Sequence, residues 1–407
     1  MRILIVTTYG FDPAFPSRPE QIQARALLRR GHTVVAHEYH DRRYPGQTPR
    51  CDWLDGGIPV HRAPTLGFVA PTALLRLLAE TRPDVIHLHH LRSLLGYQTV
   101  LAARRLGIPT VLTVHGLLHD GDLVVDRERP LEAPLRYENL LTTPQRLLRS
   151  LARGAYPRRA FRNYFIHAPL LHVDHTVALS HGERDLLTKL GVEAAKISVL
   201  PNALDFKLYA DLLANTAPAA KTTHPTILFI GQLVPRKGFD LLVRALPTVV
   251  QAIPDVRCIM VSHNQAGAAE LRRLAEAGGV TAHLDVRGRV SEAEKLRLLR
   301  EAAVVVAPSR YEGFGIPLIE ALLAEAPVIT TDVVACNEVI SHERTGLLTP
   351  YGDVEALAAA IIRLLRDPDL GRRLATEGRR EALARYGDDL LAANLEHLYE
   401  QLSHFRS

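Results

Sequence analysis

Short apolar runs alternate with longer amphipathic segments along the first half of the chain. The apolar runs predict buried strands at residues 3–6, 32–39, 85–90, 110–115 and 174–179. Between them, apolar residues recur at helical spacing, which predicts helices at residues 20–30, 94–106 and 183–190. Strands that alternate with helices form βαβ units, so we expect a parallel sheet with helices on both faces.

The same alternation restarts near residue 225. Strands are predicted at residues 226–233, 256–262, 283–288, 304–309 and 327–331. Helices are predicted at residues 239–252, 266–277 and 292–302, from Pro317 onward, and in two further segments near the C-terminus. This half of the chain therefore predicts a second α/β domain with a parallel sheet.

The segment between the two halves has a different composition. Residues 201–225 are rich in Pro, Ala and Thr and have no clear period, so we place the interdomain linker at residues 201–224. Two doubly wound domains that face each other leave a cleft at the carboxyl ends of their strands, where such sheets bind ligands. The expected parts are an N-terminal domain at 1–200, a C-terminal domain at 225–385 and a last helix at 386–407, for which a return to the first domain is one option.

The composition is that of a globular protein with two domains. The chain has 407 residues, of which 47% are hydrophobic and 23% are charged. Its three cysteines are few and far apart, which favours a reducing compartment and disfavours a thiolate metal site. No apolar stretch reaches the ~18–20 residues of a membrane span. We expect a cytoplasmic protein, with peripheral contact at the inner face of the plasma membrane as a further option.

Positive charge is concentrated in the first half of the chain. The formal net charge is +5, and the basic excess lies in residues 1–200. Residues 139–173 contain no acidic residue but six arginines, interleaved with leucine and phenylalanine. Such a surface suits anionic membrane lipid, or it lines the acceptor side of the cleft. Nucleic acid is not an expected partner, because no RNA- or DNA-binding module accompanies the arginines.

The strongest chemical signal is the segment Pro308-Ser309-Arg310-Tyr311-Glu312-Gly313-Phe314-Gly315-Ile316-Pro317-Leu318-Ile319-Glu320. Here a buried strand enters a glycine-containing loop, and a helix is expected to begin at Pro317, because proline suits the first helical position. The N–H groups of the first helical turn form a site for an anion. Glu320 lies about one turn into the helix, where its carboxylate can accept hydrogen bonds from a diol such as ribose.

A second signal is the segment Gly231-Gln232-Leu233-Val234-Pro235-Arg236-Lys237-Gly238. Gly231 lets the chain turn at the end of the strand. Arg236 and Lys237 supply adjacent cations beside an expected helix N-terminus, which suits a diphosphate. Either loop alone is explained by an ordinary turn, but both loops follow strands of one sheet and therefore can face the same crevice.

Together these motifs resemble those of the retaining nucleotide-sugar glycosyltransferases with the GT-B fold, glycosyltransferase family 4. The shared pattern is E-G-F-G-x4-E, with G-x-L-x-x-x-K-G upstream. The resemblance covers nearly the whole chain and is specific in the C-terminal half and loose in the N-terminal half. The other matching segments are residues 31–34, 84–87, 113–116, 200–202, 288–290, 345–348 and 352–357.

The resemblance implies two Rossmann-like domains that face each other and a set of site residues. The implied reaction moves a hexose from a UDP- or GDP-sugar to a glycan, lipid-linked or small-molecule acceptor, without a cofactor or metal ion. Glu312, His115 and Lys237 would be the catalytic residues. The residues implied to contact the diphosphate are Gly231, Arg236, Lys237, Phe314, Gly315 and Ile316. Glu320 would contact the ribose, and Val290 and Lys295 would lie near the base. Glu312 and His115 would contact the sugar.

Several positions depart from the family pattern. Gln232 stands where the family usually has arginine, so Arg236 would have to supply the guanidinium. Ala203 and Ala326 replace expected glycines. The N-terminal loop at residues 15–20 reads FPSRPE and lacks the usual pair of glycines. The prediction of the fold does not depend on these positions.

The expected chemistry requires no catalytic base from the protein. In transfer with retention, the departing phosphate oxygen can accept the proton of the acceptor, while the protein holds both substrates and stabilises charge. The alternatives are an epimerase or phosphorylase of the same fold, and a non-catalytic protein that binds nucleotide sugars or glycans. A Rossmann dehydrogenase is disfavoured, because no G-x-G-x-x-G follows the first strand.

Three groups of residues with metal-binding character are interpreted as structural. Asp120-Gly121-Asp122 is explained by a turn. The histidines in the segment 87–90 have no carboxylate or cysteine partner at a recognisable spacing, and the same holds for His172 and His175. We therefore predict no metal site.

Overall fold

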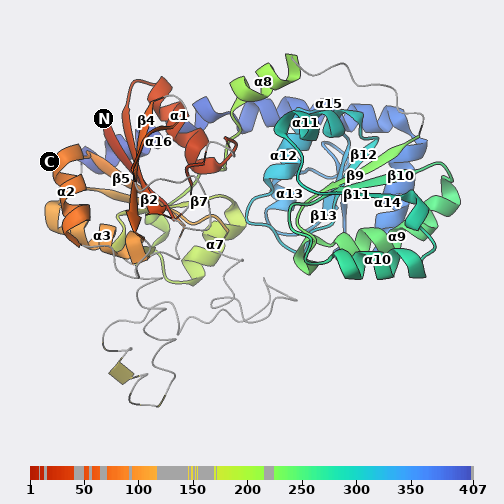
Figure 1. Ribbon diagram of the computed structural model, residues 1–407, viewed down its shortest axis with the longest axis horizontal. Coiled ribbons are helices and arrows are strands. Elements are labelled where there is room, and N and C mark those ends of the chain that lie inside the picture. The colour runs from red at the N-terminus through yellow and green to blue at the C-terminus, as the bar shows by residue number, and fades with distance from the viewer. Residues whose placement is uncertain are drawn as a thin grey trace. The chain divides into compact units, whose positions relative to one another are not determined.

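The computed structural model describes residues 1–8, 10–12, 16–40, 50–54, 57–64, 71–90, 94–116, 145, 148–149, 152, 154, 169–170, 172–214 and 224–404. The chain forms two compact units, each with its own β-sheet and flanking helices (Figure 1). The first unit contains Met1–Asp205 and Asp388–Ser407, and the second contains Phe206–Gly387.

Within the described residues, the first unit has an eight-stranded sheet in the order β3-β4-β2-β1-β5-β6-β7-β8. Neighbouring strands are parallel, except that β3 is antiparallel to β4 at the edge. The strands are β1 Arg2–Val6, β2 Thr33–His40, β3 Arg50–Leu54, β4 Ile58–Pro64, β5 Val85–His89, β6 Thr110–Thr113, β7 His175–Ala178 and β8 Ile197–Val199. The helices are α1 Pro19–Arg29, α2 Pro71–Thr81, α3 Leu94–Leu106, α7 His181–Lys189, the 3₁₀ turn η2 Ala194–Lys196 and α16 Asp388–His404.

The second unit has six described strands, all parallel, in the order β11-β10-β9-β12-β13-β14. They are β9 Thr226–Ile230, β10 Arg257–Val261, β11 Leu284–Arg287, β12 Val304–Ala307, β13 Val328–Thr331 and β14 Leu347–Thr349. The helices are α8 Phe206–Ala214, α9 Phe239–Ala252, α10 Ala268–Ala277, α11 Glu292–Glu301, α12 Ile316–Leu323, α13 Cys336–Val339, α14 Val354–Arg366 and α15 Pro368–Arg385. Two 3₁₀ turns are η3 Pro235–Lys237 and η4 Thr281–His283.

Strand order identifies the architecture of both units. The order 3-2-1-4-5-6 of the second sheet is that of a doubly wound Rossmann fold, and β4-β2-β1-β5-β6-β7 repeats it in the first. Figure 1 shows α9 and α10 on one side of the second sheet and α11, α12 and α15 on the other. The predicted fold of two Rossmann-like α/β domains is therefore confirmed.

Apolar residues at the predicted positions form the two cores. In the first unit, Ile3 and Ile5 of β1 pack with Leu27 of α1 and with Leu395 and Tyr399 of α16. The C-terminal helix thus belongs to the core of the first unit. In the second unit, apolar residues of α9, α10 and α14 cover one face of the sheet. Burial of this apolar surface holds each sheet between its helices.

The structure differs from the sequence-based prediction at several elements. The segment 201–224, expected to be an irregular linker, contains helix α8. Three helices, not two, follow β14, because Asp367 ends α14 and caps α15, where it accepts a hydrogen bond from the N–H of Leu370 at 2.9 Å. The elements that the prediction omitted are β3, β4, β8, β14, α2 and α13.

No helix in the described part of the chain combines the length and the apolar composition that crossing a bilayer requires.

Candidate functional site

The two motif loops meet at one edge of the second sheet. β9 and β12 are neighbouring parallel strands, with Val304 paired with Ile227. The loop after β9 carries η3, and the loop after β12 leads into α12. The N–H of Arg310 donates to the carbonyl of Arg236 at 2.8 Å, which joins the two loops directly. The carboxyl ends of the strands thus place both motifs together.

Gly238 makes this close packing possible. It has φ of +65° and is the N-cap residue of α9. A Cβ atom at this position would lie 1.9 Å from the carbonyl oxygen of Pro308. Glycine is therefore required both for the left-handed backbone and for the approach of the second loop.

Lys237 and Glu312 form a buried ion pair between the loops. The Nζ of Lys237 lies 2.5 Å from Oε1 of Glu312, and the hydroxyl of Ser309 donates to the same oxygen at 2.6 Å. Burial alone would raise the pKa of Glu312, but Lys237, the Ser309 hydroxyl and Arg236 together lower it below its usual value. Glu312 is therefore a carboxylate and Lys237 is held in one place.

Arg236 contributes a second cation beside this pair. Its Nη1 lies 3.8 Å from Oε2 of Glu312, too far for a hydrogen bond. This nitrogen is buried, and no group in the described part of the chain bonds to it. A buried guanidinium N–H without an acceptor is costly, and an anion would provide the missing acceptor.

The N-terminus of α12 lies next to these charges. Gly315 caps the helix with φ of +97°, and the helix begins at Ile316, one residue before the predicted start. Phe314 is buried and packs edge-on against Tyr386, with ring centroids 5.8 Å apart. A cavity of about 10 Å³, room for a water-sized group, is lined by residues that include Lys237, Ser309, Glu312, Gly315 and Pro317. The ammonium of Lys237 thus borders one small space together with the first turn of α12.

Glu320 forms a second buried ion pair on the same helix. Lys295 of α11 donates to Oε1 of Glu320 at 2.7 Å and also contacts Glu292 at 2.7 Å. The hydroxyl of Tyr209, on α8, donates to the same oxygen of Glu320. Burial opposes the charge of Lys295, but the two carboxylates raise its pKa above the usual value. Glu320 is thus fixed from two sides.

The remaining predicted residues of this unit lie in loops at the same edge of the sheet. Gly231 follows β9, and its N–H donates to the carbonyl of Val261 at 3.0 Å. Gln232 contacts His263, with 3.3 Å between side-chain nitrogens. Val290 lies in the loop between β11 and α11 and is half-buried. Lys237 pairs with Glu312 and Lys295 pairs with Glu320, whereas Val290 has no charged group with which to join either pair.

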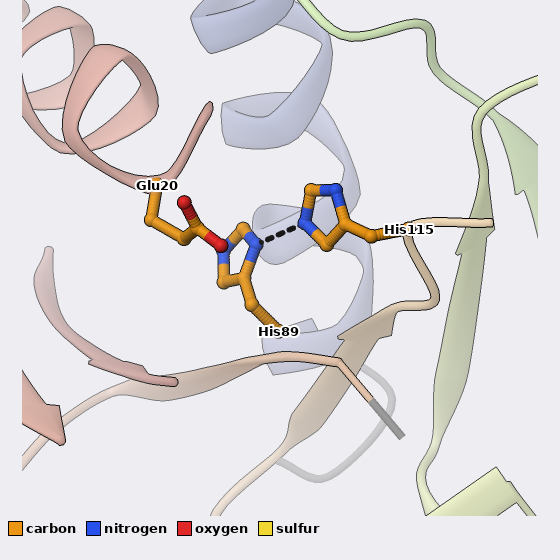
Figure 2. Close-up of side chains that lie close together, drawn as sticks. All are labelled: Glu20, His89 and His115. Carbon is orange, nitrogen blue, oxygen red and sulfur yellow. Dashed lines mark hydrogen bonds between the residues drawn. The ribbon is translucent and has the colours of Figure 1, made fainter. Parts of the chain in front are cut away.

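His115 lies in the first unit, just after β6. Its φ is +56°, and the N–H of the next residue, Gly116, donates to Oε1 of Glu183 at 2.8 Å. The Nε2 of His115 lies 2.7 Å from Nδ1 of His89, the last residue of β5, with ring centroids 5.0 Å apart (Figure 2). Burial lowers the pKa of both histidines well below the usual value, so both rings are neutral near pH 7.

A carboxylate from a distant part of the sequence lies among these histidines. Glu20, in the first turn of α1, accepts a hydrogen bond from His90 at 2.7 Å. Burial alone would raise the pKa of Glu20, but His90 and His115 lower it to about 2. The ligand atoms of Glu20, His89 and His115 lie within 4.8 Å of one another. The fold thus gives the histidines a carboxylate neighbour that no spacing in the sequence indicates.

Two other interpretations fall wholly or mainly on residues that the structure does not describe. The turn Asp120-Gly121-Asp122 lies outside the described residues. So does most of the basic segment 139–173, of which residues 145, 148–149, 152, 154, 169–170 and 172–173 are described.

The sequence analysis missed several side chains of these clusters. Ser309 was part of the motif, but its hydrogen bond to Glu312 depends on the loop conformation. Tyr209 lies in the segment expected to be a linker, and only the apolar spacing of α8 could have indicated it. Glu20 and His90 are 70 residues apart in sequence, so no local pattern connects them.

Comparison with known proteins adds independent findings. A family model described as Glycosyltransferase Family 4 matches residues 23–208. A second model, described as Glycosyl transferases group 1, matches residues 215–381. The two matches fall on the two halves of the chain in succession.

Individual relatives match over part of their length. A phosphatidyl-myo-inositol mannosyltransferase of Mycobacterium leprae is 36% identical over 180 residues, which are 44% of this chain and 47% of the relative. A GDP-mannose-dependent alpha-(1-6)-phosphatidylinositol monomannoside mannosyltransferase of Mycobacterium tuberculosis is 32% identical over 50% of this chain and 55% of the relative. The chain thus spans about half the length of these relatives.

A solved structure matches over almost its full length. The sucrose-phosphate synthase of Thermosynechococcus elongatus has a TM-score of 0.73, with 22% identity over 99% of each chain. At this identity, the likeness concerns the fold alone.

Proposed function

The chain belongs to the family 4 glycosyltransferases with the GT-B fold, and on this premise we propose that it transfers a hexose from a nucleoside-diphosphate sugar to an acceptor, with retention of the anomeric configuration. The observation that carries the proposal is the cluster of Lys237, Arg236 and Glu312 at the N-terminus of α12. Two cations beside a helix N-terminus at one sheet edge suit a diphosphate.

The donor would bind along the edge of the second sheet. Its diphosphate would accept hydrogen bonds from Lys237, from the unpartnered Nη1 of Arg236 and from the backbone N–H groups of Phe314, Gly315 and Ile316. Glu320 would hold the ribose diol, because Lys295 and Tyr209 both bind its Oε1 and leave Oε2 to accept from hydroxyls.

Glu312 would orient the transferred sugar. Lys237 and Ser309 occupy its Oε1, and its Oε2 makes no hydrogen bond to Arg236 at 3.8 Å. That oxygen can accept from a sugar hydroxyl. The resemblance also assigns His115 to the transferred sugar.

The reaction then depends on charge rather than on a protein base. As the bond from the anomeric carbon to the diphosphate breaks, negative charge grows on the departing oxygen, where Lys237 and the helix N–H groups stabilise it. The same oxygen accepts the proton of the attacking hydroxyl on the same face of the sugar, which gives retention.

The relatives' names point to a lipid acceptor. Both mycobacterial relatives are named for mannosyl transfer to phosphatidylinositol compounds, and one is named for GDP-mannose. We therefore infer GDP-mannose and an inositol phospholipid as the first substrates to test, with peripheral binding at a membrane surface. UDP-hexoses and soluble glycans form the comparison set.

The test is transfer of labelled hexose by the purified full-length chain. Lys237→Ala and Glu312→Ala should each lower the rate by roughly a hundredfold or more, because each removes a group that acts on the transition state. Lys196→Ala is the matched control: Lys196 belongs to the first unit and forms an exposed ion pair with Glu193, so its loss should leave the rate unchanged.

Circular dichroism and the melting temperature show whether each variant is folded. A folded Lys237→Ala, Glu312→Ala double variant with near-normal turnover would refute the proposal. Binding of the nucleotide sugar without any transfer or hydrolysis would favour the non-catalytic alternative.

A further inference from the structure

We propose that Glu20, His89 and His115 bind one divalent transition-metal ion of the zinc type. Two imidazoles and one carboxylate form a donor set that Zn²⁺ prefers, with a fourth position open to water. The ion site lies wholly within the first unit, and nothing in the proposed sugar transfer requires it.

The fold brings the three residues to one edge of the sheet. β1, β5 and β6 are consecutive neighbours, and the three side chains come from the helix or loop at their carboxyl ends. Glu20 is in the first turn of α1, which follows β1, while His89 ends β5 and His115 follows β6. Figure 2 shows the His89 ring between Glu20 and His115.

The distances are close to those of a metal site. The three ligand atoms lie within 4.8 Å of one another. Around a tetrahedral Zn²⁺, with bonds of about 2.0–2.2 Å, ligand atoms are roughly 3.3 Å apart. The distances between the ligand atoms therefore need to shorten by at most about 1.5 Å, and rotation of the side chains provides a movement of this size.

His89 carries an independent sign of a missing ligand. Its side chain is 2% exposed, and its buried Nε2 has no hydrogen-bond partner among the described residues. When Nδ1 of His89 carries the proton, Nε2 has a lone pair with no donor. A cation bound to that lone pair would supply the missing partner.

The surroundings already hold two of the ligands in place. The ring of His87 stacks on His89 at 4.6 Å, with planes 16° apart. His90 donates to one oxygen of Glu20, and a carboxylate can keep that bond and still offer its other oxygen. Hydrogen-bonded ligands of this kind are typical of metal sites.

Ion binding would turn the ring of His115. In the structure, a hydrogen bond joins Nδ1 of His89 to Nε2 of His115, and one of the two neutral rings donates its N–H to the other. The ring that accepts this hydrogen bond carries its own proton on its second nitrogen, so that second nitrogen cannot bind a metal ion. Both histidines can bind the ion only if this hydrogen bond is exchanged for a metal bond.

The turn of the His115 ring would connect ion binding to sugar transfer. This consequence, unlike the ion site itself, rests on the proposed function. His115 cannot contact the sugar while it ligates an ion. Saturating Zn²⁺ should therefore lower hexose transfer by roughly tenfold, and a chelator should restore it.

The test uses the full-length chain, freed of metal by chelation and then titrated with Zn²⁺ against a chromogenic chelator. We expect one ion per chain. Glu20→Gln keeps the shape but loses the charge, and His89→Leu removes an imidazole, so each should weaken binding by roughly tenfold to a hundredfold. His397→Gln is the control and should leave the affinity unchanged, because His397 is exposed on α16 and contacts Gln401.

A second measurement does not depend on the variants' folding. Co²⁺ bound to the unmodified chain should give the strong visible absorption of a four-coordinate ion, and Zn²⁺ should displace it. Equal affinity in the unmodified chain and Glu20→Gln, or only the weak spectrum of six-coordinate Co²⁺, would overturn the proposal. Zn²⁺ binding without any hexose transfer would leave this site standing and refute the proposed function instead.

Discussion

The polar clusters of the two units differ in the charge that they hold. In the second unit, Lys237 and Lys295 are paired with the buried carboxylates of Glu312 and Glu320. In the first unit, neutral histidines surround the single carboxylate of Glu20. Fixed cations suit an anionic ligand, whereas neutral imidazoles suit hydroxyl groups or a metal ion. Two units with the same strand order thus offer different chemistry at the same edge of their sheets.

Gly238→Ala should have the largest effect, because it separates the two loops of the second unit. The added Cβ would lie 1.9 Å from a backbone oxygen that cannot rotate away. We expect a loss of more than about 3 kcal/mol in the free energy of unfolding and loss of nucleotide binding. Denaturant unfolding and nucleotide titration measure the two effects.

Gly279→Ala is the matched control for this prediction. Gly279 also has a positive φ, +67°, but nothing lies within 4 Å of its missing Cβ. The backbone strain alone should cost about 1 kcal/mol and leave nucleotide binding intact. Equal losses in the two variants would show that the approach of Pro308 to Gly238 is unimportant.

The second unit was predicted more completely than the first because its signals are local. Gly231, Lys237, Glu312 and Glu320 lie in two short motifs that each follow a buried strand. Parallel strands end at the same edge, so periodicity and glycine positions were enough to bring the motifs together. The ion pairs themselves were not predicted, because they depend on loop conformation.

The cluster of the first unit could not be predicted in the same way. Glu20, His89 and His115 are far apart in sequence, and only the strand order β1-β5-β6 makes them neighbours. A search for ligands at short spacing therefore found histidines without a carboxylate. Elements of three residues, such as β8 and β14, were missed for a related reason, because they are too short to show a period.

Tyr399→Phe should have a smaller effect, confined to the first unit. The buried hydroxyl of Tyr399 donates to Nδ1 of His87 at 2.5 Å and accepts from the amide of Gln23 at 3.3 Å. Its removal takes one hydrogen bond from Nδ1 of His87, which Gln23 still contacts at 3.0 Å, and should cost about 1 kcal/mol in the free energy of unfolding. Nucleotide affinity, which we assign to the second unit, should not change. A large loss of nucleotide affinity would contradict this division.

The most direct test of the central claim compares the binding of a nucleoside with that of its diphosphate. Calorimetric titrations would use guanosine and GDP, then uridine and UDP, with the unmodified chain and with Lys237→Ala. We predict that the preferred diphosphate binds roughly a hundredfold more tightly than its nucleoside, and that Lys237→Ala removes about tenfold or more of this preference without weakening the nucleoside. The same preference in both proteins would contradict a diphosphate site at Lys237 and the N-terminus of α12.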